Sequence, residues 1–190
     1  MASASYFVAM AHNNAWANHR LLSACASLSQ ADFEAERTGF FPSLKATLNH
    51  ILVVDRFYVD ALEGGRLGPE AWRDEEPCPT AADLQREQGA VDRRLIALCQ
   101  AMTADKLTAP VCLVRADREQ VETADRVLLH LFEHQIHHRG QAHCMLAGSD
   151  AAPPQLDEFF LAEEAPLRAA DFAALGFDEA GVWQVDPSEL

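Results

Sequence analysis

The segment Val127–Leu146, VLLHLFEHQIHHRGQAHCML, holds five of the eight histidines of the chain. On a helix, where each residue turns by about 100°, His134 and His138 lie one above the other. Leu131 and Met145 fall on the same side and continue it as an apolar stripe. Such a stripe is the face that a helix normally buries. The segment therefore predicts a long helix that carries two imidazoles into a core.

Two buried imidazoles need polar partners, because burying an unpaired polar group costs free energy. A metal ion shared by both rings is one explanation, and ordinary hydrogen bonds are the other. The i,i+4 spacing is that of H-E-x-x-H metalloproteases, but Gln135 stands where their glutamate base would be. A zinc-type site takes three or four ligands from protein and water. The pair therefore needs a third ligand from elsewhere in the chain.

The third ligand is sought on a helix predicted from Pro42 to Leu62, with a proline in its first turn and Gly64 after its end. His50 lies inside the wide apolar face of this helix. A lone histidine in such a place is more often a hydrogen-bonded core residue than a ligand. It is nevertheless the best-placed candidate, so His50, His134 and His138 form the predicted metal site.

The remaining histidines of the segment have other expected positions. His130 and His137 project toward the edge of the apolar face, and His143 points nearly the opposite way, where solvent is expected. His130 is one turn before His134, so either a hydrogen bond to a metal ligand or a surface position is open to it. Gln141, one turn after His138, either orients a nucleophile or has no special role. No catalytic residue is assigned.

Two further long helices are expected, over residues 5–28 and from Thr80 to Met102, with Thr80 as the N-cap of the second. Asn18 is read as a buried hydrogen-bonding residue rather than a site residue. Residues 111–122 form either a short hairpin or irregular chain. The fold class is therefore all-α, a four-helix bundle over about residues 5–148 within a single domain, 1–190. The extension 149–190 is expected to pack on the bundle as short helices and irregular chain.

The composition of the chain indicates its cellular compartment and disfavours one class of partner. The net charge of -14 makes a nucleic acid an unfavourable partner. No apolar run reaches membrane-spanning length, and the first residues do not read as a signal peptide. Five cysteines, none in a C-x-x-C pair, indicate reduced thiols in the cytoplasm. One of them, Cys78, lies between two prolines and is expected to be exposed.

Three stretches, AHNNAWANHRLL, SLKATLNHILVVDRFYVDAL and LLHLFEHQIHHRGQAHCML, together resemble the DinB family. This is the damage-inducible, YfiT-like group of the thiol transferase superfamily. The resemblance implies an up-down-down-up four-helix bundle and a divalent metal held by His50, His134 and His138. It also implies a homodimer. Family members of known activity use low-molecular-weight thiols, in S-transfer or in isomerisation of small acids, and the family name refers to induction by DNA damage.

The expected function follows from an incomplete ligand set. Three neutral imidazoles suit a borderline ion, zinc or nickel, with iron or manganese as alternatives, and leave a position open. A thiol bound there loses its proton, and its thiolate attacks a small-molecule electrophile. Water in the same position would make a hydrolase. The rival reading is a non-enzymatic, structural or stress-linked metal-binding protein. A di-iron carboxylate site is not predicted, because the Glu-x-x-His pairs it needs are not found.

Overall fold

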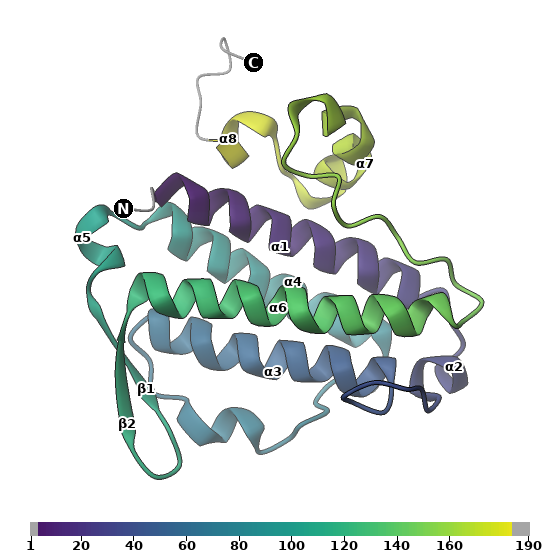
Figure 1. Cartoon of the computed structure of the whole chain (residues 1–190), viewed down its shortest axis with the longest axis horizontal. Coiled ribbons are helices and arrows are strands. Elements are labelled where there is room, and N and C mark those ends of the chain that lie inside the picture. Colours follow the sequence, from purple (N-terminus) through teal and green to yellow (C-terminus); the bar gives the residue numbers. More distant parts are fainter. Residues whose placement is uncertain (1–3, 184–190) are drawn as a thin grey trace.

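Four long helices dominate the computed structural model, which describes residues 4–183 (Figure 1). Helices α1 and α3 each contact both α4 and α6, so the four surround one interior. The chain is mostly helical, as the sequence predicts. The long helices are α1 (Ala4–Cys25), α3 (Leu44–Leu62), α4 (Ala81–Gln100) and α6 (Ala124–Ala147).

The connections carry short elements. Strands β1 and β2 pair in antiparallel register, with Cys112 opposite Val121, so the hairpin reading of this segment is confirmed. The hairpin lies beside the end of α3 and the start of α6 (Figure 1). The short elements are α2 (Gln30–Glu34), η1 (Gly68–Trp72), α5 (Ala104–Leu107), β1 (Pro110–Val114), β2 (Glu119–Thr123), η2 (Ala162–Glu164), α7 (Ala165–Leu175) and α8 (Glu179–Trp183).

Capping side chains set the helix starts. The Thr80 hydroxyl accepts a hydrogen bond of 3.1 Å from the backbone N–H of Asp83, which confirms the predicted N-cap of α4. Helix α3 begins at Leu44 and not at Pro42, because Ser43 caps it by accepting 3.1 Å from the N–H of Ala46. The predicted start was therefore two residues early.

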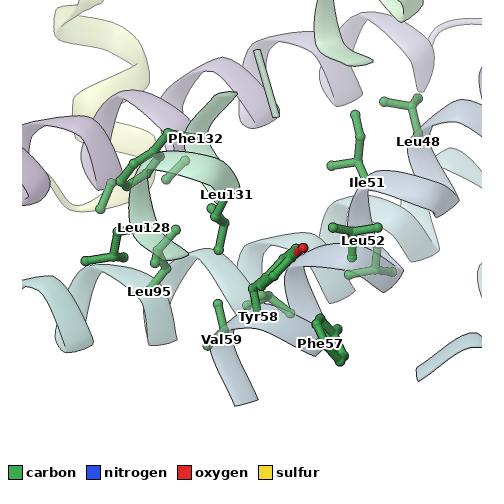
Figure 2. Close-up of a cluster of buried hydrophobic side chains, with 14 of the residues drawn as sticks. Leu48, Ile51, Leu52, Phe57, Tyr58, Val59, Leu95, Leu128, Leu131 and Phe132 are labelled. Atoms are coloured by element: carbon green, nitrogen blue, oxygen red, sulfur yellow. The ribbon is translucent and has the colours of Figure 1, made fainter. Parts of the chain in front are cut away.

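The apolar core lies between the long helices, and Figure 2 shows the part of it that joins α3, α4 and α6. Each fully buried side chain of leucine or phenylalanine size contributes about 1.5–3 kcal/mol. This packing holds α3 and α6 side by side, so side chains on their facing surfaces have fixed relative positions. The labelled core residues are Leu48, Ile51, Leu52, Phe57, Tyr58, Val59, Leu95, Leu128, Leu131 and Phe132.

The C-terminal extension covers a second face of α1. Trp16 is fully buried there against Phe159, and its indole N–H donates to the Asp171 carboxylate at 3.2 Å. Arg20 donates to the same carboxylate at 2.8 Å. Helices α7 and α8 therefore pack on α1 through a small apolar cluster, beside which Trp16 and Arg20 both donate to the Asp171 carboxylate. The extension forms short helices, as expected.

All five cysteines are free thiols. The expectation that Cys78 is exposed was wrong, because only 2% of it is accessible. The buried side chain of Asn49 receives a 2.9 Å hydrogen bond from the backbone N–H of Cys78 and donates another of 2.9 Å to its carbonyl. This clamp draws the loop onto α3, and burial raises the pKa of the Cys78 thiol. Across residues 4–183, no helix combines the length and the apolar character that crossing a membrane requires.

Candidate metal centre

The three predicted histidines lie together in the space between α3 and α6. Their candidate ligand nitrogens are all within 4.8 Å of one another, and the Nε2 atoms of His50 and His134 are 3.0 Å apart. The ring centroids of His134 and His138 are 4.4 Å apart. Among residues 4–183, this is the one group of three or more such side chains close enough to hold an ion.

The distances suit a small divalent ion. Two imidazole nitrogens bound tetrahedrally to zinc, at about 2.0–2.1 Å each, lie about 3.3 Å apart. Hydrogen bonds engage the rings separately, His50 with His134 and His138 with Gln141, whereas a shared ion would join all three in one site. The site is thus compatible with a divalent metal, and neutral nitrogen ligands are those that borderline ions take.

The protonation states favour metal binding. Burial, together with the neighbouring imidazoles, lowers the pKa of His50 to about 4 and that of His134 to about 3. Burial also lowers the pKa of His138, although its hydrogen bond to Gln141 opposes the change. All three rings are therefore neutral at pH 7 and offer a lone pair.

Gln141 orients one of the rings. The Nδ1 atom of His138 is 2.9 Å from the Oε1 atom of Gln141, so Nδ1 carries the proton and Nε2 keeps its lone pair. The amide group of Gln141 then donates to His137 at 3.0 Å. A partner of this kind fixes the tautomer and the orientation of a ligating histidine. Gln141 therefore positions His138, and the nucleophile-orienting role considered from the sequence stays a prediction.

The aromatic ring of Phe41 and a cavity lie beside the triad. The ring of Phe41 lies 4.4 Å from the ring of His50 and 5.6 Å from that of His138. His50 also lines a cavity of about 280 Å³, together with Trp72 and Glu75. A small molecule placed in this cavity would contact the His50 edge of the triad.

Two other histidines of α6 lie outside the triad. Of the two alternatives considered for His130, the structure shows the surface position: the residue is exposed, its ring packs edge-on against Tyr58 at 5.2 Å, and it makes no hydrogen bond to a triad residue. His143 was expected in solvent but is half-buried, and its Nε2 atom is 2.8 Å from the carbonyl oxygen of Pro154. The extension folds back over α6 at this point, which the helix pattern alone does not reveal.

Behind the triad lies a buried polar network that the sequence analysis missed. A weak signal exists in the sequence, since three helices each carry a polar pair at i,i+4 that lies side by side on one face. Asp55 on α3 completes the network. Its members are Asn14, Asn18, Asp55, Gln88, Asp92, Gln135 and Arg139, and all are buried.

Amide side chains in this network bridge a buried cation and a buried anion. Arg139 donates to the side-chain oxygens of Asn18 at 3.1 Å and Gln135 at 2.8 Å, and it also contacts Asn14. Asp92 accepts 3.1 Å hydrogen bonds from the amide groups of Asn14 and Asn18. Asn18 is thus a buried hydrogen-bonding residue, as expected. Since Gln135 and Arg139 directly follow His134 and His138, the network anchors the turns of α6 that carry these two histidines.

The contribution of the buried Asp92 carboxyl to stability is expected to fall as the pH rises from about 4 to about 6. Burial raises the pKa of Asp92 to about 6 and that of Asp55 well above its ordinary value. In this window the folded state retains protons that the unfolded chain has released, so ionisation favours unfolding. A shift of two pKa units for Asp92 corresponds to at most about 3 kcal/mol. The lowered pKa values of His50 and His134 act in the opposite direction, but they are present in the unaltered protein and in Asp92→Asn alike. The difference between urea titrations of these two proteins from pH 4 to 7 therefore measures the Asp92 contribution, and equal profiles would contradict the assignment.

Comparison with known proteins places these observations in a family. A model of the DinB family matches residues 1–170, which include the triad and reach into α7, beyond the segment that the sequence motifs cover. No curated protein matches the chain. Because the match spans most of the sequence and contains both helices that carry the triad, the chain belongs to the DinB family.

Proposed function

We propose that the protein is a metal-dependent enzyme that activates a low-molecular-weight thiol for S-transfer to a small electrophile. The observation that carries the proposal is a set of three neutral imidazoles beside a cavity. Among the described residues, no fourth histidine, cysteine or carboxylate joins the group. Catalytic metal sites have this composition, with three protein ligands and an open position.

His50, His134 and His138 would hold the ion, which we expect to be zinc or nickel, with iron or manganese as alternatives. Such an ion supplies the Lewis acidity that keeps a coordinated thiol deprotonated. The thiol's proton passes to solvent, its sulfur forms a bond to the electrophilic carbon, and the leaving group departs with the electron pair of the broken bond. In this scheme Phe41 and Trp72 pack against the apolar part of the reactants, and Gln141 maintains the tautomer of His138.

The proposal also covers the course of the helices, the compartment and the oligomeric state. The four long helices are proposed to follow the up-down-down-up course of the family, with one ligand from α3 and two from α6. The protein is proposed to act in the cytoplasm as a homodimer on a small-molecule substrate, without action on DNA. The cysteines support the compartment, because all five are free thiols. The net charge of -14 likewise disfavours binding to nucleic acid.

The test begins with protein purified without a nickel column, so that the bound metal can be identified. Metal-loaded and chelator-treated samples are then assayed with a panel of small thiols and alkyl halides, following loss of thiol and release of halide. Thiol-dependent turnover that disappears with the metal supports S-transfer. Metal-dependent ester hydrolysis without thiol turnover would instead identify a hydrolase, and metal binding without either activity would favour a structural or stress-linked role.

A further inference from the structure

A second cavity, of about 250 Å³, lies where the β1–β2 hairpin meets α3 and α6. The side chains around it are mostly polar, and α6 contributes His130, one turn before the triad residue His134. One turn of helix advances by about 5.4 Å, so the cavity lies next to the triad along α6. Its polar lining comprises Tyr58, Arg115, Gln120, Glu122, Arg126 and His130.

Arg115 is the group that points to a ligand. Its guanidinium is half-buried and lies 4.8 Å above the ring of Phe57, yet no carboxylate lies within ion-pairing distance of it among residues 4–183. Its contacts with the Gln120 oxygen and the Tyr58 hydroxyl are both long, at 3.4 Å. By contrast, Arg118 in the same hairpin pairs with Asp117 at 3.1 Å.

The charges lining the cavity leave a positive excess. Glu122 is its one carboxylate, and this group is already engaged by Arg126 at 3.5 Å and by the Gln120 amide at 3.1 Å. Arg115 therefore remains without a counter-charge, in a chain whose net charge is -14. The aromatic surface beneath Arg115 holds the planar fork in place and leaves its N–H groups for a ligand.

We propose that this cavity binds the carboxylate of a small acid, with Arg115 as a two-pronged donor and with Tyr58 and His130 at its sides. A guanidinium matches a carboxylate through two parallel hydrogen bonds. His130, which lines the cavity, has its ring centroid 6.4 Å from that of His134, so the carboxylate subsite lies one helical turn from the triad. The catalytic meaning of this subsite rests on the proposed S-transfer, in which either the electrophile or the thiol carries the carboxylate.

Anion binding is tested first without any reaction. Chelator-treated full-length protein is titrated with acetate at constant ionic strength, and the side-chain Nε–H signal of Arg115 is followed by NMR. A saturable shift is expected. Arg115→Gln should weaken acetate binding, measured by calorimetry, at least tenfold, whereas Arg118→Gln should leave it unchanged. No saturable binding, or an equal loss in both variants, would overturn the proposal.

A conservative variant separates a loss of acetate binding from a loss of folding. Arg115→Lys retains the charge but not the fork, so acetate binding several-fold weaker than that of the unaltered protein is expected, with an unchanged circular dichroism spectrum. Binding as tight as in the unaltered protein would contradict the two-pronged arrangement.

The link to the reaction uses matched reagents. With iodoacetate the thiolate sulfur displaces iodide from a carbon next to a carboxylate, and with iodoacetamide it does so next to a neutral amide. If the electrophile carries the acid, Arg115→Gln raises KM for iodoacetate and not for iodoacetamide. If the thiol carries it, the variant raises KM for 3-mercaptopropionate and not for 2-mercaptoethanol. Equal effects within both pairs would overturn the link, while acetate binding without any turnover would reject the S-transfer and keep the subsite.

Discussion

Replacing His134 with alanine is expected to remove nearly all metal from the purified protein. His134 contacts both other rings, with its Nε2 atom 3.0 Å from that of His50 and its centroid 4.4 Å from that of His138. Loss of a partner that merely orients a ligand costs about 10–100-fold in metal affinity, so loss of a ligand should cost more than about 100-fold. Metal content after dialysis, measured by mass spectrometry, checks this.

Two further substitutions test whether the loss of metal is specific to the three histidines. His50→Ala should lose metal as well, because α3 supplies one ligand to a site that otherwise belongs to α6. His143→Ala is the matched control on α6, since His143 bonds to the Pro154 carbonyl and lies outside the triad. Full metal content in His50→Ala would show that the assignment across two helices is wrong.

Replacing Arg139 with methionine is expected to lower the free energy of unfolding by about 3–5 kcal/mol, the usual cost of leaving a buried charge without its partner. The side chain of Arg139 is only 5% exposed. Its removal leaves the oxygens of Asn18 and Gln135 without their donor and deprives Asp92 of the nearby positive charge. Urea denaturation monitored by circular dichroism measures the change.

The matched control is Arg118→Met, at an exposed position in the hairpin, which should alter stability by less than about 0.5 kcal/mol. A loss below about 1 kcal/mol in Arg139→Met would show that the network contributes little. Because Arg139 follows His138, the variant is also expected to bind metal more weakly while it is still folded. Metal affinity measured below the unfolding transition separates the two effects.

The apolar stripes explain how much of this site could be predicted. They place His50 on one helix and His134 and His138 on another. The apolar faces of two such helices pack against each other because this removes them from water. The structure brings the three rings together as that argument requires. The N-cap at Thr80, and the hairpin as one of two alternatives, were predictable for another reason, because turn and cap residues act through local backbone geometry.

Features that depend on long-range polar contacts could not be predicted in this way. Arg139 and Asp92 look like surface residues in a linear pattern, and only the fold shows that they face one another across amide side chains. Cys78 is buried because Asn49, 29 positions earlier, holds its backbone. Trp16 lies outside the main core stripe, and it is buried only because the extension returns to cover α1.

The central claim is that the three histidines hold a divalent ion with a position left for a thiol. X-ray absorption at the metal edge, on protein loaded with the metal it naturally contains, tests it most directly. The account predicts scattering from three imidazoles in the resting protein and an added sulfur neighbour when a small thiol is supplied. A shell already filled by protein ligands, and unchanged by every thiol tested, would contradict it.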